Sequence, residues 1–353
     1  MNRRNALKQT GFLAAGALLG GCSARQNAPA SARVSMLTLP KVKVSEDRVI
    51  RTVVGLRPFR PPGFHVEKER HGLKTIVHNY GHGGGGLTLS WGSSYLALEK
   101  LFEDGAAPSR VVVLGCGALG LSAARLLQQR GLDVTIYAKD LPPNTTSNIT
   151  AGQWLPYSVA DFRRRTPAFN EQLERASRFS HRMFQNMLGS HYGVRWLTNY
   201  VLSEHPFGGG GEDPSTAGLF PETRNFEPDE HPFPVPHVRQ YVTMLIEPST
   251  YLNAVVRDFQ LAGGRIVVRT FEDVSDVLSL LEPAIVNCTG LGAKAIFGDD
   301  ELTPIKGQLT FLLPQPEVDY ITLYGDLYMM PRTDGILLGG THERGEWSMD
   351  VDL

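Results

Sequence analysis

The stretch Arg110-Val-Val-Val-Leu-Gly-Cys-Gly-Ala-Leu-Gly120 decides the fold class of this chain. Its apolar residues 111–114 predict a strand buried on both faces, which leads into Gly115-x-Gly117-x-x-Gly120 and a helical pattern over residues 121–129. In this spacing the glycines allow a tight turn, a close approach of the backbone to a pyrophosphate, and close packing of helix on strand. A second strand, residues 134–138, follows, and Asp140 lies 20 residues after Gly120. The pattern predicts a dinucleotide site; the alternative is a glycine-rich turn that binds no ligand.

Composition limits the classes of function. At 353 residues the chain can bury one large core or two domains. With 35 basic against 36 acidic residues, the charge gives no indication of a nucleic-acid partner. Cys116 and Cys288 each stand in an apolar context beside glycine, without metal-ligand spacing, so we expect two free buried thiols, no disulfide and no metal site.

The first 22 residues predict a targeting segment. Arg3-Arg4-Asn5-Ala6-Leu7-Lys8 and the apolar run after it resemble a twin-arginine export signal, and Leu19-Gly20-Gly21-Cys22 resembles a bacterial lipobox with Cys22 as the acylated residue. The alternative is an ordinary cleaved signal peptide. Residues 23–47 are expected to be a tether, and no later apolar run is long enough for a transmembrane helix. The expected location is therefore the cell envelope, periplasmic or at the outer surface, with a lipid anchor as the only membrane attachment.

Residues 48–104 hold a second informative region. Residues 49–56 and 75–78 have strand patterns, and residues 93–102 have a helical one. Between the last two lie four successive glycines, Gly83 to Gly86, whose backbone is free to lie against a flat ligand. The alternative is a flexible loop, which the neighbouring Asn79, Tyr80, His82 and Trp91 disfavour.

The remaining patterns alternate between helices and strands. Thr145, Thr146 and Ser147 lie in a loop whose hydroxyls suit phosphates, although a capped loop before a helix is an adequate alternative. Other helices are expected over 170–188 and 250–261, and other strands over 265–270 and 284–288. Alternation in 308–313, 320–324 and 335–340 predicts antiparallel strands of a second, smaller domain. The predicted class is α/β, in an α+β two-domain arrangement.

Several motifs together resemble the D-amino-acid oxidase family of flavoenzymes. The two most specific are Gly55-x-Arg57-Pro58-x-Arg60-Pro61 and Asn79-Tyr-Gly-His-Gly-Gly84-x-Gly86-Leu-Thr-Leu. The others are Gly115-x-Gly117-x-x-Gly120-Leu-Ser, Tyr137-Ala-Lys-Asp140, Thr145-Thr-Ser147 with Ala151-Gly152-x-Trp154-x-Pro156-Tyr157, Asn287-Cys-Thr-Gly290, Gly307-Gln308 and Gly339-Gly340-Thr341. They cover nearly everything from residue 48 to residue 353.

The resemblance implies a Rossmann-type FAD-binding domain and a smaller, mainly antiparallel substrate domain. In the family the Arg57 and Gly84 motifs lie at the C-terminal end, so the chain resembles a circular permutant; a duplicated or mis-assembled gene fragment is the alternative. The expected division is 1–22 signal, 23–47 tether, 48–104 permuted segment, 105–200 and 250–300 FAD domain, and 201–249 and 301–353 substrate domain. Relatives carry a helical stretch between the equivalents of Trp347 and Val49, so part of the small domain is expected to be exposed or covered by a partner.

The resemblance also implies site residues. Arg57 would bind the substrate α-carboxylate, Tyr324 would add a hydroxyl to it, Tyr328 would line the pocket, and the Gly84 carbonyl would accept from the substrate amine. Residues expected to bind FAD are Gly115, Gly117, Ala118, Leu119, Gly120, Lys139, Asp140, Thr145, Thr146, Ser147, Ala151, Gly152, Gln153, Gly83, Gly84, Gly86, Leu87 and Thr88. The implied reaction is oxidation of a D-amino acid by hydride transfer from Cα to flavin N5, with oxygen giving hydrogen peroxide, and with a 2-oxo acid and ammonia as the other products.

Each assignment has an alternative. It remains open whether Arg57 is a structural ion-pair residue, whether Tyr324 and Tyr328 are core aromatics, and whether His82 is a structural residue. Lys139, directly after the strand, weakens the case for Asp140 as a ribose ligand. For the whole chain, the alternatives are a glycine, amine or imino-acid oxidase of the same fold, or a surface-tethered flavin or ligand-binding protein with little turnover. A nicotinamide-dependent dehydrogenase fits the motifs least, and a homo-oligomer remains open.

Overall fold

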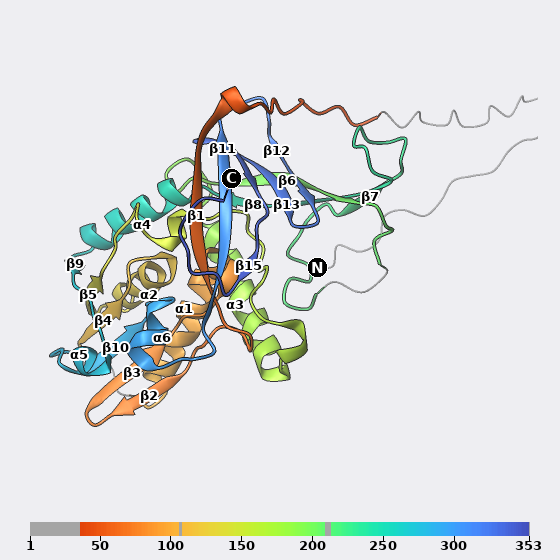
Figure 1. Cartoon of the computed structure of the whole chain (residues 1–353). Coiled ribbons are helices and arrows are strands. Elements are labelled where there is room, and N and C mark those ends of the chain that lie inside the picture. Colours follow the sequence, from red (N-terminus) through yellow and green to blue (C-terminus); the bar gives the residue numbers. More distant parts are fainter. Residues whose placement is uncertain (1–35, 106–107, 209–212, 353) are drawn as a thin grey trace, which may run out of the picture. The chain divides into compact units, whose positions relative to one another are not determined.

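The computed structural model describes residues 36–105, 108–208 and 213–352, which build two sheets with helices around them (Figure 1). The six-stranded sheet has the order β2-β3-β10-β4-β5-β9 and is parallel except for β2. Its strands are β2 (Lys68–His71), β3 (Lys74–His78), β4 (Arg110–Leu114), β5 (Asp133–Ala138), β9 (Arg265–Val268) and β10 (Ala284–Asn287). The helices are α1 (Gly86–Phe102), α2 (Ala118–Gln128), α3 (Pro167–Gln185), α4 (Pro248–Leu261), α5 (Val274–Leu278) and α6 (Gly292–Phe297).

Helices cover both faces of the parallel sheet, because its central strand is apolar on both sides. Val111 and Val113 of β4 belong to a core cluster with residues of α1, α2 and α4, whereas Val112 and Leu114 belong to another with residues of α5 and α6. All four side chains are fully buried. This is the doubly wound arrangement that the run 111–114 predicts, and it leaves the carboxyl ends of the strands free to form a site.

The second sheet is mainly antiparallel and has nine strands. Its order is β1-β11-β14-β13-β12-β6-β8-β7, with β15 pairing β11, and only β6 and β12 run parallel. Its strands are β1 (Val49–Phe59), β6 (Val194–Ser203), β7 (Arg224–Phe226), β8 (His237–Ile246), β11 (Thr303–Leu312), β12 (Tyr320–Tyr324), β13 (Leu327–Arg332), β14 (Gly335–Gly339) and β15 (Glu343–Arg344). One of its faces carries the core around Leu309 and Met330, and the other carries the core around Tyr200 and Ile336.

The segment before residue 110 contributes to both sheets. In Figure 1 β1 runs beside β11, and the two pair antiparallel from Val49↔Leu312 to Phe59↔Thr303. β3 pairs parallel with β10, and α1 packs against α2 and α3. The residues that precede the glycine-rich turn are therefore integral to the fold.

Helix α1 begins earlier than its sequence predicts. We expected a helix from Ser93, but the helix runs from Gly86 and includes Gly92. The Gly92 N–H donates to Ser180 Oγ at 2.7 Å, and a Cβ at Gly92 would collide with the backbone of Ala176 in α3. Close contact between two helices thus requires glycine where intrinsic helix propensity disfavours it.

Part of the predicted tether lies on the antiparallel sheet. Leu37, Leu39 and Val42 pack against the core around Tyr200 and Ile336. The Leu37 N–H donates to the Glu230 carbonyl at 2.8 Å, and the Tyr320 hydroxyl donates to the Pro40 carbonyl at 2.7 Å. Residues 36–45 therefore pack on the antiparallel sheet, although we expected them to belong to a tether. The predicted signal, with Cys22, lies outside the described residues.

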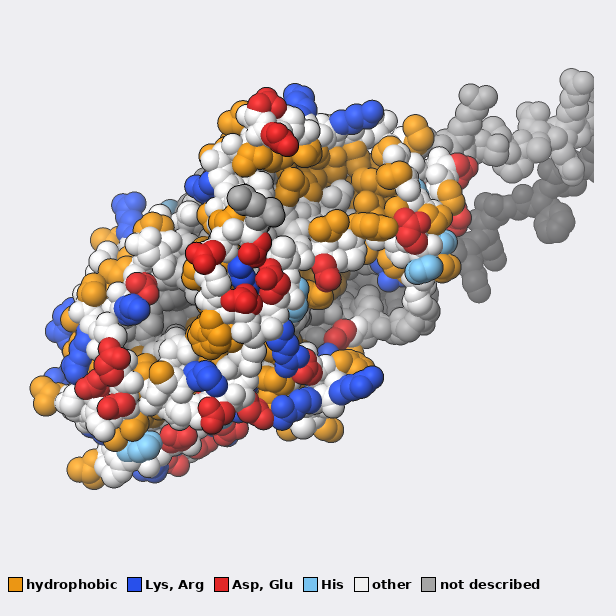
Figure 2. All heavy atoms as spheres, in the orientation of Figure 1, with side chains coloured by type: hydrophobic (Ala, Val, Ile, Leu, Met, Phe, Trp, Pro, Cys, Tyr) orange, Lys and Arg blue, Asp and Glu red, His pale blue; other side chains and the backbone are white. Residues whose placement is uncertain are grey.

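The surface shows no dominant charge on the face in view. Figure 2 shows acidic and basic side chains interspersed there, in agreement with the near balance of 35 basic and 36 acidic residues. Within the described ranges, none of the helices is long and apolar enough to span a bilayer.

Candidate active site

A cavity of about 750 Å³ lies between the two sheets, at the carboxyl ends of the parallel strands. One wall comes from the segments that follow β4, β5 and β10, and the other from β1, β11, β13 and the turns beside them. This is the edge at which open parallel sheets bind their ligands, and the volume lies within the range of ligand pockets.

The glycine-rich turn forms a cradle at this edge. Gly115 has a φ of +104°, and a Cβ there would collide with the Cys288 carbonyl. A Cβ at Gly117 would lie 2.9 Å from Ser147 Oγ, which accepts a hydrogen bond from the Ala118 N–H at 3.0 Å. The N-terminus of α2 thus faces the cavity, where its N–H groups can attract phosphate.

Most residues expected to contact the cofactor line this cavity. They are Gly83, Gly84, Gly86, Leu87, Gly115, Gly117, Ala118, Leu119, Lys139, Asp140, Thr145, Thr146, Ser147, Ala151, Gly152 and Gln153. The other two expected residues, Gly120 and Thr88, do not line it. Gly120 lies beneath the turn, where a Cβ would collide with the Gly115 carbonyl. The buried Thr88 hydroxyl donates to the Leu155 carbonyl at 3.2 Å, so it holds a neighbouring loop instead.

The second glycine run is packed on one side and open to the cavity on the other. Gly83–Gly85 forms a 3-10 turn before α1. The Gly84 N–H donates to the Ser158 carbonyl at 3.2 Å, and a Cβ at Gly84 would lie 2.9 Å from the Tyr157 carbonyl. These glycines are needed because residues 157–159 lie directly against them, so the run is not a flexible loop.

His82 is one of the residues that line the cavity, but both of its ring nitrogens are buried. Its side chain is fully buried, and the ring stacks on Phe64 with the centroids 4.4 Å apart. Neither ring nitrogen is solvent-accessible or has a hydrogen-bond partner among the described residues. Burial lowers the pKa of His82 from 6.5 to about 3. Because both ring nitrogens are buried, His82 cannot reach a proton of a ligand in the cavity, which favours the structural alternative for His82.

Arg57 presents a cation to the other end of the cavity. It lies on β1, its guanidinium covers Gly307, and its Nη1 lies 3.4 Å from the carbonyl oxygens of Lys306 and Thr341. Among the described residues, no carboxylate lies within ion-pair distance of it. The alternative of a structural ion pair is therefore not observed, and the guanidinium can accept an anionic ligand.

Two tyrosines accompany Arg57. The Tyr328 ring covers Gly339, and burial raises the Tyr328 pKa while the charge and a hydrogen bond of Arg57 oppose the shift. The Tyr157 hydroxyl donates to Asp326 Oδ1 at 3.4 Å, and burial and the Asp326 charge raise the Tyr157 pKa. Sequence reasoning gave no role to Tyr157, Asp326 or His342, although all three line the cavity. They come from separate loops, so no local spacing indicated them.

Tyr324 lies elsewhere. Its exposed hydroxyl donates to Glu204 Oε1 at 3.1 Å, and the residue does not line the cavity. Tyr324 pairs with Leu327, and Leu323 pairs with Tyr328, across a turn of two residues. Side chains alternate between the faces of a strand, so Tyr324 and Tyr328 point to opposite faces. The Tyr324 hydroxyl is therefore not at the cavity, where we expected it to join the substrate carboxylate, whereas Tyr328 lines the cavity as expected.

The far end of the cavity suits a nucleotide. Lys139 and Asp140 both line it after β5, together with Arg269 and Phe271 after β9. The Arg269 N–H donates to the Ala138 carbonyl at 3.0 Å, which holds these two strand ends together. In a bound dinucleotide, Lys139 or Asp140 would hold the sugar and the glycine cradle would hold the phosphates.

The cysteines beside the cradle are free and buried, as predicted. Burial raises the pKa of Cys116 and of Cys288 to about 12, so both stay as thiols at neutral pH. Within residues 36–105, 108–208 and 213–352, no group of three or more metal-ligating side chains could hold an ion.

Comparison with known proteins agrees with this geometry. The profile of the DAO family, described as FAD dependent oxidoreductase, matches residues 110–353. The chain belongs to this family. A D-amino-acid oxidase of Rubrobacter xylanophilus is 30% identical over 255 residues, 69% of this chain and 73% of the relative. A D-amino-acid oxidase of Streptomyces coelicolor is 27% identical, covering 69% and 72%.

Solved structures show the same fold at low identity. Glycine oxidase from Bacillus cereus has a TM-score of 0.50 with 14% identity, over 69% of this chain and 74% of that one. Glycine oxidase from Geobacillus kaustophilus has a TM-score of 0.50 with 17% identity, over the same shares. The protein is thus an FAD-dependent oxidoreductase of the DAO family, and its cavity and glycine cradle fit that cofactor.

Proposed function

We propose that this protein oxidises D-amino acids, with oxygen as the electron acceptor. The observation that carries the proposal is Arg57, a cation without a carboxylate partner among the described residues, in the same cavity as the glycine cradle. The α-carboxylate is the group that all amino acids share, and a guanidinium can bind it through two parallel hydrogen bonds. The D-amino-acid oxidases among the relatives support the assignment.

The side chains around Arg57 supply binding and orientation. In the proposed complex Arg57 holds the carboxylate, Tyr328 lines the pocket beside it, and the Gly84 carbonyl accepts from the substrate amine. No side chain needs to act as a base when the amine is already neutral, which agrees with the inaccessible ring of His82. Held by the glycine cradle, FAD would supply the acceptor for the Cα hydride and would return the two electrons to oxygen as hydrogen peroxide. The imino acid then takes up water and releases ammonia to give the 2-oxo acid.

The test is the flavin spectrum of the purified full chain. We expect a yellow protein that a D-amino acid, but not its L-enantiomer, bleaches without oxygen, and that releases peroxide in air. A panel that also contains glycine and sarcosine separates a D-amino-acid oxidase from an amine oxidase of the same fold. Bound flavin with no bleaching by any member of the panel would contradict the proposal.

We further propose that residues 1–22 export the protein by the twin-arginine route and that Cys22 carries a lipid anchor at the cell envelope. The support is the sequence Arg3-Arg4 and the lipobox-like Leu19-Gly20-Gly21-Cys22. Incorporation of a labelled fatty acid should occur in the wild type and be lost in Cys22→Ala. Labelling of both the wild type and Cys22→Ala, or of neither, would contradict the proposed lipid anchor at Cys22. Sedimentation of the released protein would show whether it is a monomer or a homo-oligomer.

We also propose that the chain is a circular permutant of its family. The support is that β1 and β3, which precede the matched residues 110–353, pair with β11 and β10 inside them. A chain in which residues 48–104 follow the C-terminal end through a short linker should then bind FAD and unfold cooperatively. Loss of folding in several linker lengths would favour the alternative of a rearranged gene fragment.

A further inference from the structure

A buried polar contact joins the segment before residue 110 to the cavity wall. His78 of β3 and Asn287 of β10 are partners in register, and both are buried. Asn287 Nδ2 lies 2.9 Å from His78 Nδ1. Buried polar groups need partners, and here each of the two supplies one for the other.

The orientation of the Asn287 amide is fixed by the turn that follows it. Asn287 Oδ1 accepts from the Thr289 N–H at 3.1 Å and from the Thr289 hydroxyl at 2.8 Å. The amide nitrogen must therefore face His78, and because it can only donate, His78 Nδ1 must accept. The proton of the neutral ring is then on Nε2, which lies 3.3 Å from Glu69 Oε2.

The turn held by Asn287 is part of the FAD cavity. Cys288, Thr289 and Gly290 all line it. The Cys288 N–H donates to the Leu114 carbonyl at 2.8 Å, and the Cys288 carbonyl would collide with a Cβ on Gly115. A change in this turn would therefore displace the glycine cradle directly.

We propose that neutral His78 is a positioning residue for FAD: it holds the Asn287 amide, which holds the turn 288–290 against the glycine cradle. A proton on Nδ1 would place an N–H against the Asn287 NH₂. The amide cannot rotate to accept that proton without losing both hydrogen bonds from Thr289. FAD binding should therefore weaken as the pH falls.

The surroundings of His78 agree with a neutral ring. Burial lowers the His78 pKa, while the Glu69 carboxylate opposes that shift. Because FAD binding favours the neutral form, affinity should be full above the His78 pKa of the folded apoprotein, which burial holds below its ordinary value, and should decline as the pH falls through that pKa. The titratable and aromatic groups that face the ring are Glu69 and His71 of β2, His65, Tyr80, Asp299 and Phe297.

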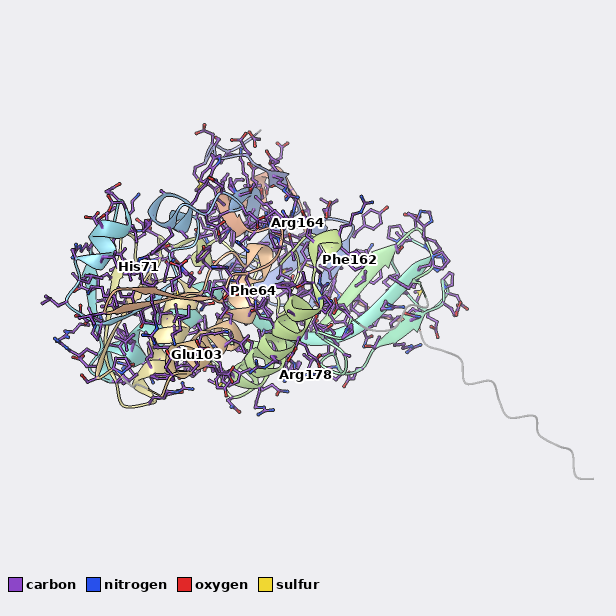
Figure 3. All side chains as sticks on the ribbon, turned by 90° about the horizontal axis from the view of Figure 1, so that it is seen from below. Phe64, His71, Glu103, Phe162, Arg164 and Arg178 are labelled. Atoms are coloured by element: carbon purple, nitrogen blue, oxygen red, sulfur yellow. The ribbon has the colours of Figure 1, made fainter. Side chains whose placement is uncertain are left out.

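The first measurement is the dissociation constant of FAD from the full-length apoprotein, by flavin fluorescence, between about pH 8 and about pH 5. We expect roughly tenfold weaker binding at the acid end, which corresponds to 1.4 kcal/mol. His71, labelled in Figure 3, is unsuitable as a control because it contacts Glu69, which also faces His78. The matched control is His191→Asn, because the His191 side chain is exposed and its nearest carboxylate is that of Asp258. This variant should keep the wild-type profile.

Two variants test the cause. His78→Asn keeps an acceptor near the place of Nδ1 and cannot titrate, so its FAD affinity should no longer change with pH. Asn287→Asp can accept from a protonated His78 while still accepting from Thr289, so it should also lose the acid weakening. A wild type without pH dependence would overturn the proposal, as would a folded variant of either kind that keeps the wild-type profile. Failure of the protein to oxidise D-amino acids would not contradict the role proposed for His78, because the experiment measures FAD binding alone.

Discussion

At the scale of single residues, Arg57 is the side chain on which activity should depend most. A lysine keeps the charge but cannot form two parallel hydrogen bonds to a carboxylate. For Arg57→Lys we expect kcat/KM to fall by about 100-fold or more, since hydrogen bonds between charged groups contribute about 1.5 to 3 kcal/mol each. Peroxide release measures this. Arg51→Lys, on the same strand but paired with Asp334 at the surface, should change little. Equal losses in both would contradict a specific role for Arg57.

Asp326 should disfavour acidic substrates. It lines the same cavity as Arg57, it accepts from Tyr157, and no cation among the described residues lies within ion-pair distance of it. A like charge a few ångströms away costs about 1 kcal/mol in a solvated site. Asp326→Asn should therefore raise the kcat/KM of D-aspartate relative to D-alanine by roughly fivefold. Asp319→Asn, at the opposite end of β12, is the control. An unchanged ratio in Asp326→Asn would mean that the carboxylate does not face the substrate.

His82 predicts a pH dependence of stability. The His82 pKa is lowered to about 3 in the folded protein. The contribution of His82 to the free energy of unfolding is therefore complete above pH 6.5 and is lost as the pH falls below that value. A single such histidine should reduce the free energy of unfolding by about 2 kcal/mol between about pH 6.5 and about pH 5. His82→Leu should show a smaller fall in the urea midpoint over this range. Parallel falls in variant and wild type would assign the effect to other groups, such as His65, whose pKa is also lowered, to about 4.

At the scale of elements, the turn between β4 and α2 should be the most sensitive to added volume. Gly115→Ala places a Cβ against the Cys288 carbonyl at a φ of +104°. We expect FAD affinity to fall by more than about tenfold and the melting temperature to drop. Gly131→Ala is the matched control, because Gly131 also has a positive φ, +80°, but no atom lies within 4 Å of its Cβ position. It should lose some stability and keep FAD affinity. Equal FAD affinity in both variants would contradict the role of the glycine cradle in binding FAD.

Elements with a local signal were predicted well. The strand–turn–helix around Gly115 follows from apolar periodicity and glycine spacing, and its strand boundaries differ by one residue from those observed. Helix α1 was predicted too short because Gly86 and Gly92 disfavour a helix unless a neighbour packs against them, and the neighbour, α3, is about 80 residues away. Tyr324 was misplaced because the side of a hairpin on which a residue lies depends on the turn length, which the motif comparison ignored.

At the scale of the whole molecule, the sequence predicted which residues line the site better than it predicted where their side chains lie. Sixteen of the eighteen expected cofactor residues line the cavity. No role was predicted for Asp326 or His342, and Tyr157 appeared only within a family motif, because these residues lie on separate loops that meet at one cavity. The cover provided by residues 36–45 was missed for the same reason: a short apolar segment shows its partner only in the folded chain.

The pairing of β1 with β11 has a consequence for synthesis. Val54 pairs with Gln308, so the ribosome must add about 250 residues after β1 before its partner exists. At about 5 to 20 residues per second, this interval lasts roughly 12 to 50 seconds. During that time an early-made, partly apolar strand has no edge to join, and it is open to chaperones or to aggregation. A nascent chain stalled before residue 303 should therefore be unable to close its cavity or retain flavin, however long it is held.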